Sequence, residues 1–67
     1  MTYMNNTAVT SNFNPHTQAH VVPGVGSYWF IAGGPLYGQW CVSFNSGTSY
    51  VVESSAIALQ HFADRQG

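Results

Sequence analysis

Few side chains in this sequence could do chemistry, and three of them are histidines. His16 and His20, spaced as HTQAH, could share a metal ion on one face of a helix, with His61 as a third ligand. Pro15 before this segment and the VVP of residues 21–23 after it disfavour a regular helix at that place. We therefore predict neither a metal site nor a bound cofactor.

Cys41 and Glu53 are the remaining candidates for catalysis. Nothing in the sequence places Cys41 beside His61, and no basic residue lies near Cys41 to lower the pKa of its thiol, which favours the role of a small buried hydrophobe. A single carboxylate such as Glu53 is typical of a solvated residue or of a partner for Arg65. The glycine-rich segment 24–34 follows no predicted strand and opens no helix, so it is no phosphate loop. We predict that the protein is not an enzyme.

Charge is nearly absent from the chain. Charged residues make up 4% of its 67 residues, and residues 1–52 contain none. Binding to phosphates needs Lys and Arg, so nucleic acid is excluded as a partner. Chains of this length bury only about 60% of their unfolded surface, and a single Cys41 cannot form an intrachain disulfide. A neutral surface promotes association, and we expect partner chains to complete the fold.

The uncharged residues 21–44 are numerous enough to span a bilayer. Gly and Pro residues and Gln39 interrupt this run, and its apolar residues alternate, which favours strands over a membrane helix. The start of the chain has neither the basic nor the apolar region of a secretory signal. We predict a cytoplasmic protein if it is not part of a virion, and keep a membrane-active protein that uses residues 21–44 as a third possibility.

The composition changes once along the chain. Residues 1–20 are rich in Asn and Thr and predict an extended N-terminal arm. Its scattered apolar side chains would anchor it to a neighbouring chain: Tyr3, Met4, Val9 and Phe13. Residues 21–67 are predicted to form a single small β domain.

The β domain has the pattern of an antiparallel meander or of a small SH3-like barrel. Strands are predicted over residues 27–32, 39–44 and 48–53, with the NSG of residues 45–47 as a hairpin turn and Gly47 in the left-handed conformation. In that register Phe44 faces Thr48, Val42 faces Tyr50 and Trp40 faces Val52. One buried face is therefore predicted for Trp40, Val42, Phe44, Tyr50 and Val52. The domain ends in a short helical turn capped by Ser54 or Ser55, with Ile57, Leu59 and Phe62 directed inward.

The C-terminal part of the chain, residues 50–54 followed by Gln60, His61 and Phe62, resembles the last third of the small plasmid-type dihydrofolate reductases. Those proteins are SH3-like barrels that assemble as tetramers around one shared pore. The resemblance implies a small oligomeric β-barrel that binds a ligand or catalyses a reaction in such a pore, with Gln60 and His61 as its wall. The basic residues that this family uses to hold its substrates have no counterpart here, so this function is the alternative.

The chain is lysine-free, aromatic and rich in Asn, Thr, Ser and Gly, with a predicted extended arm and compact β core. In this general character it resembles the small structural proteins of virions, including the capsid cement and decoration proteins of tailed phages. The resemblance implies a structural assembly protein that binds other protein subunits, itself and a capsid shell protein, and stabilises the virion. Charge is depleted at the cores of such interfaces. The predicted partner-binding residues are Tyr3, Met4, Val9, Phe13, Tyr28, Trp29, Phe30 and Tyr37.

Overall fold

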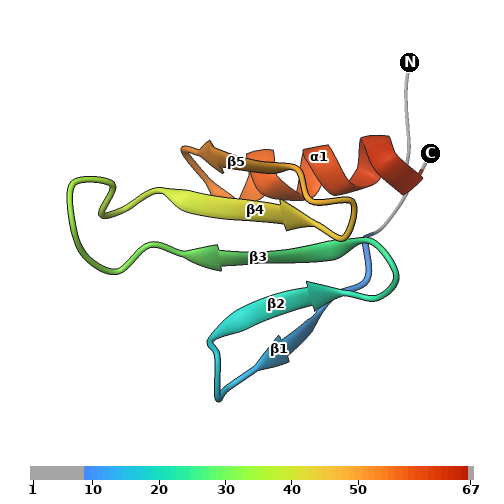
Figure 1. The fold of residues 1–67 in the computed structure, drawn as a ribbon, viewed down its shortest axis with the longest axis horizontal. Helices are drawn as coiled ribbons and strands as arrows, with labels where there is room; N and C mark the ends of the chain where they lie inside the picture. The colour runs from blue at the N-terminus through green and yellow to red at the C-terminus, as the bar shows by residue number, and fades with distance from the viewer. Residues whose placement is uncertain (1–8, 67) are drawn as a thin grey trace.

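The computed structural model describes residues 9–66, which form five strands and one helix (Figure 1). In chain order the elements are β1 Asn12–Asn14, β2 Ala19–Val22, β3 Gly26–Phe30, β4 Trp40–Phe44, β5 Ser49–Val52 and α1 Ser55–Gln66. The strands form a single open sheet in the order β1-β2-β3-β4-β5, and every neighbouring pair is antiparallel. The predicted mainly β antiparallel meander with a C-terminal helix is confirmed.

The β4–β5 hairpin has the predicted register. Trp40 pairs with Val52 and Val42 with Tyr50. The Phe44 N–H donates to the Thr48 carbonyl at 2.8 Å, and the Gly47 N–H donates to the Phe44 carbonyl at 2.9 Å. Gly47 has a φ of 102°, which confirms its left-handed conformation. Alternating apolar residues and an NSG turn are therefore sufficient to specify this hairpin.

A second hairpin lies where the sequence predicts an arm. β1 and β2 pair through Asn12–Val21 and Asn14–Ala19, so the prediction of an extended arm over residues 1–20 is wrong for residues 12–20. Asn14 accepts two hydrogen bonds that close the turn. Its carbonyl accepts from the Gln18 N–H at 2.7 Å, and its Oδ1 accepts from the His16 N–H at 2.9 Å. Gln18 has a φ of 60°. Residues 1–8 lie outside the described part of the chain.

The core lies between α1 and one face of the sheet. Figure 1 shows α1 running beside β4 and β5, away from the β1–β2 hairpin. The Phe62 ring, fully buried, lies 5.6 Å from the Tyr28 ring and 5.0 Å from the Phe44 ring. The helix begins as predicted, with the Ser54 Oγ accepting from the Ile57 N–H at 3.2 Å. The buried apolar residues are Val22, Tyr28, Val42, Phe44, Val52, Ala58 and Phe62.

The predicted buried face of the sheet needs two corrections, and the predicted inward side of the helix needs one. Trp40 is only half-buried, although it packs against the core. Tyr50 is 41% exposed because β5 is the last strand of the sheet, and its ring stacks on His61 at 5.1 Å. Ile57 is 42% exposed because the helix turns Ala58 and Phe62, four residues apart, toward the sheet. The predicted burial of Val42, Phe44, Val52 and Phe62 is confirmed.

We predict that Phe62→Ala removes about 3–5 kcal/mol from the free energy of unfolding, because the fully buried ring is the main contact between α1 and the sheet. Ile57→Ala, at a residue of the same helix that is 42% exposed, is the matched control and should change it by less than about 1 kcal/mol. Urea unfolding followed by circular dichroism measures both variants. Equal losses in the two variants would show that the helix is not held by Phe62.

Candidate partner-binding surface

The two faces of the sheet have different surroundings. Strand pairing aligns Phe13, His20, Tyr28, Val42 and Tyr50 in one row across the five strands. The aromatic contacts of Phe62 with Tyr28 and of His61 with Tyr50 place this row on the face that α1 covers. We call it the helix face, and the opposite face the open face. α1 contacts β3, β4 and β5. On the helix face of β1 and β2, Val22 is buried in the core, whereas Phe13 is 55% exposed.

A line of aromatic rings runs along the helix face from the loop after β3 to β1. The Tyr37 ring lies 5.9 Å from Phe30, Phe30 lies 5.5 Å from Trp40, and both pairs meet edge to face. Trp40 is 6.0 Å from His20, and His20 is 4.9 Å from Phe13. We call these five residues the aromatic strip. Edge-to-face and tilted contacts of this kind fix the rings relative to one another.

Three residues of the aromatic strip are open to solvent. Phe13 is 55% exposed, Phe30 43% and Tyr37 67%, whereas His20 and Trp40 are half-buried. Large aromatic side chains exposed side by side, unlike single exposed ones, are typical of interaction sites.

Tyr37 is exposed on a loop whose backbone is hydrogen-bonded across its base. The Ile31 N–H donates to the Gln39 carbonyl at 2.8 Å, and the Gly38 N–H donates to the Ile31 carbonyl at 3.0 Å. Gly38 has a φ of 91°, a conformation that glycine adopts without strain. The loop therefore presents Tyr37 in a defined position next to Phe30.

The predicted partner-binding residues divide into several groups. Phe13, Phe30 and Tyr37 come together in the aromatic strip. Tyr28 is only 5% exposed and belongs to the core, so its prediction as a contact residue is wrong. Val9 is half-buried against the core, and Trp29 is half-buried on the open face. Tyr3 and Met4 lie outside the described residues.

His20 and Trp40 are members of the aromatic strip that the sequence did not indicate as contact residues. For Trp40 the alternation along β4 predicts the correct face of the sheet, because Trp40 and Val42 point to the same side. Alternation does not show where the covering helix ends, so it does not predict that Trp40 is partly exposed. His20 had no such indication, because the segment around it was predicted to be an arm. Its ring stacks on Tyr28 at 4.8 Å with an angle of 10° between the planes.

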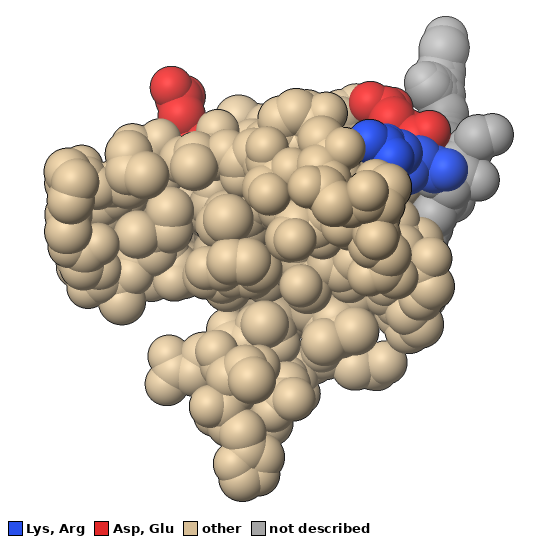
Figure 2. Space-filling model, in the orientation of Figure 1, with Lys and Arg blue, Asp and Glu red and all other residues tan. Residues whose placement is uncertain are grey.

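Electrostatics distinguish the aromatic strip from the few charged places on the surface. Figure 2 shows the charged side chains in two places, with neutral surface over the rest of the face drawn. Glu53 follows β5, and Asp64 and Arg65 lie in the last turn of α1. The Arg65 guanidinium lies 4.2 Å from the centre of the Phe44 ring, a cation–π contact. The aromatic strip itself carries no carboxylate, ammonium or guanidinium group.

The candidate metal ligands are on different elements. His16 lies in the β1–β2 turn, His20 on β2 and His61 on α1. Within residues 9–66 no three His, Cys, Asp or Glu side chains come close enough together to hold a metal ion.

Cys41 and His61 lie on opposite sides of the sheet. Cys41 pairs with Trp29 and Val51 on the open face, whereas His61 stacks on Tyr50 on the helix face. Burial raises the pKa of the Cys41 thiol above its usual value, because the thiolate loses solvation. This is the opposite of what an activated nucleophile needs.

The structure also bears on the two alternative functions. Gln60 and His61, the predicted wall of a shared pore, lie in the middle of α1, and the neighbouring Phe62 is buried in the core. None of the helices in residues 9–66 has the length and apolar character needed to cross a membrane.

Comparison of the chain with protein-family models, with curated proteins and with solved structures finds no match.

We predict that Cys41 reacts slowly with iodoacetamide in the folded protein. Its raised pKa keeps the thiol protonated near neutral pH, and only the thiolate reacts. The alkylation rate at pH 8 should be lower than in the same chain unfolded in urea, and its increase with pH should continue to a higher pH than in the unfolded chain. Mass spectrometry of timed samples measures both rates. A folded chain that reacts faster than the unfolded one would contradict this account.

Proposed function

We propose that this protein is a structural assembly protein that binds other protein subunits through the aromatic strip, and that it is a capsid cement or decoration protein of a virion. The observation that carries the proposal is the strip itself: exposed, mutually fixed aromatic rings on a chain with three charged side chains. The particular assignment to a virion rests on the general character of the sequence.

The chemistry of the aromatic strip favours a protein partner. Protein interfaces are enriched in Tyr, Trp and Phe at their cores and depleted in charged residues there. Aromatic anchors give much contact area for little loss of side-chain entropy, and interface hot spots concentrate on them. Phe13, Phe30 and Tyr37 have these properties, and their exposed area gains burial only when another molecule covers it.

Binding to a shell should depend on the aromatic strip and tolerate salt. We predict that Tyr37→Ser and Phe30→Ser each weaken binding by about tenfold or more, which corresponds to the loss of a contact worth more than about 1 kcal/mol. Ile57→Ser is the matched control, because Ile57 is 42% exposed and Phe30 43%, but Ile57 is on α1. Co-sedimentation with a shell assembled from the major capsid protein encoded nearest to this gene measures the binding.

The same experiment includes molar sodium chloride and mild urea. With one basic and two acidic side chains, few ion pairs are open to screening, so the binding should persist in salt and weaken in urea. Loss of binding in salt, or equal binding by the Tyr37 and Ile57 variants, would contradict the proposed contact.

Self-association, the other part of the proposal, has a candidate contact at the outer edge of β5, the last strand of the sheet formed by residues 9–66. The hydrogen bond from Phe44 to Thr48 turns the backbone of Thr48 toward β4, so the backbone groups of Ser49 and Val51 point outward by alternation. β5 itself contains no Lys, Pro or charged residue, the features that normally prevent edge pairing, and Glu53 follows directly after it. If a second copy pairs with this edge about a two-fold axis at Val51, Ser49 of each copy lies opposite Glu53 of the other. The two Glu53 carboxylates then do not face each other.

We predict that Val51→Pro reduces self-association while the monomer stays folded. Proline removes the outward N–H of Val51, which the β4–β5 ladder does not use, and proline is tolerated on edge strands in this orientation. Val51→Thr keeps the N–H and the β-branched shape and is the control. Analytical ultracentrifugation over a range of concentrations measures the association constant. Equal association of the two variants would place the self-contact elsewhere.

A further inference from the structure

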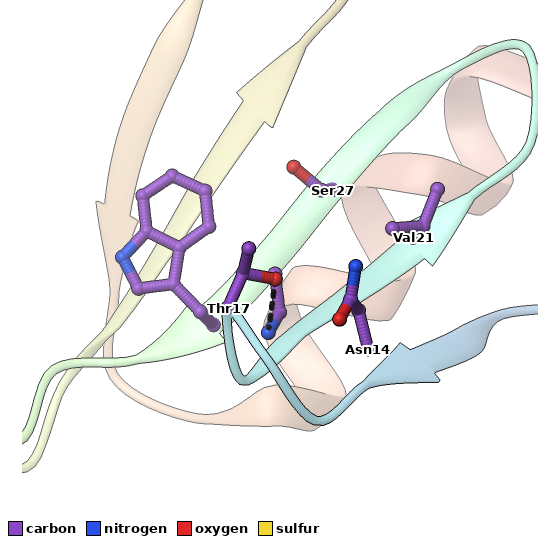
Figure 3. Close-up of a pocket in the computed structure, with 6 residues that line it drawn as sticks. Asn14, Thr17, Val21 and Ser27 are labelled. Carbon is purple, nitrogen blue, oxygen red and sulfur yellow. Dashed lines mark hydrogen bonds between the residues drawn. The ribbon is translucent and has the colours of Figure 1, made fainter.

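The open face of the sheet has a hollow at the β1–β2 end. Its volume is about 460 Å³, within the size range of small-molecule sites, and it is wide open to solvent. Figure 3 shows Asn14, Thr17, Val21 and Ser27 around it, with α1 behind the sheet. Ala19 and Trp29 complete the lining. The hollow is therefore separate from the aromatic strip, which lies on the helix face.

The strand register explains why the hollow forms there. Ala19 pairs with Trp29 on one side and with Asn14 on the other, so a very small side chain lies between two larger ones. Trp29 lines the hollow from β3, and Thr17 lines it from the β1–β2 turn, where Figure 3 shows it. Val21 and Ser27, paired with each other on β2 and β3, continue the floor.

The polar groups of the hollow are neutral and are positioned by the turn. Asn14 uses its Oδ1 to accept from the His16 N–H at 2.9 Å, so its NH₂ group can still donate. The Thr17 Oγ1 accepts from the Ala19 N–H at 3.3 Å, and its hydroxyl hydrogen can still donate (Figure 3). The Ser27 hydroxyl can donate and accept. An indole wall thus faces an amide and two hydroxyls, with no ionic group in the lining.

We propose that this hollow binds one ring of a neutral carbohydrate. A pyranose ring has an apolar face of C–H bonds that can lie against the Trp29 indole, and hydroxyl groups around its rim that both donate and accept hydrogen bonds. Asn14, Thr17 and Ser27 offer partners for that rim. An anionic sugar or nucleotide would find no cation here, because Arg65, the one basic residue of the chain, lies over Phe44 on the helix face.

The two tryptophans lie on opposite faces and allow a direct test by NMR. The full-length ¹⁵N-labelled protein is titrated with maltotriose, cellotriose and triacetylchitotriose, and with cationic chitotriose and anionic trigalacturonate as charged comparators. At least one neutral sugar should shift the indole N–H signal of Trp29 saturably, with a Kd of about 1 mM or below, and leave that of Trp40 in place. No saturable Trp29 shift with any neutral sugar up to about 10 mM would overturn the proposal, as would tighter binding of a charged comparator.

Two variants test the geometry while keeping the turn intact. Asn14→Asp preserves the Oδ1 acceptor for His16 but removes the NH₂ donor, and it should weaken sugar binding about tenfold. Trp29→Ala should abolish it, provided that its amide spectrum stays dispersed. Tyr37→Ser, on the aromatic strip, is the control and should leave sugar binding unchanged. Unchanged affinity in Asn14→Asp, or loss of affinity in Tyr37→Ser, would overturn the assignment to this hollow independently of the proposed assembly function.

Discussion

The packing of Phe62 between Tyr28 and Phe44 is the interaction on which the rest of the structure depends. A helix of 12 residues has only marginal stability in isolation, and so has a small sheet whose apolar face is in contact with water. Each element therefore becomes stable by covering the other. Ala58 lets the helix approach closely, and Arg65 extends the contact with its guanidinium over Phe44. With no disulfide available to a chain with one cysteine, this layer of side chains is the main support of the fold.

The size of the helix also determines where the surface stays apolar. A helix with its side chains is about 10 Å across, and neighbouring strands are about 4.8 Å apart, so one helix covers two or three strands of a sheet. Here α1 contacts β3, β4 and β5, and the aromatic strip lies on β1 and β2 and at the ends of β3 and β4 that face the loop of residues 31–39. The strip is thus a direct result of adding a single helix to a five-stranded sheet. Within residues 9–66 no helix or strand covers the open face, and there a small Ala19 beside Trp29 leaves the hollow.

The parts of the fold that the sequence predicts are those whose signals are local. The β4–β5 hairpin follows from strict alternation and a glycine at the left-handed position, and the start of α1 follows from the Ser54 cap. The sequence does not predict the β1–β2 hairpin because its left-handed residue is Gln18 rather than glycine or asparagine, and because both strands are short and β1 is mainly polar. The exposure of Tyr50 and the burial of Tyr28 depend on which strands the helix covers, and periodicity within a strand carries no such information.

The scarcity of charge constrains how any partner is recognised. Complementary charges accelerate association and reject wrong partners, and neutral surfaces associate at only about 10⁵–10⁶ M⁻¹ s⁻¹. For this chain, selectivity must come from ring positions and backbone pairing, as in the fixed edge-to-face contacts of Phe30 with Tyr37 and Trp40. Such recognition suits a self-associated protein on a partner that presents many identical sites, because the second contact of a linked pair is intramolecular and offsets a modest affinity at each site. The proposed attachment to a shell lattice provides that condition, and an encounter with a single dilute protein does not.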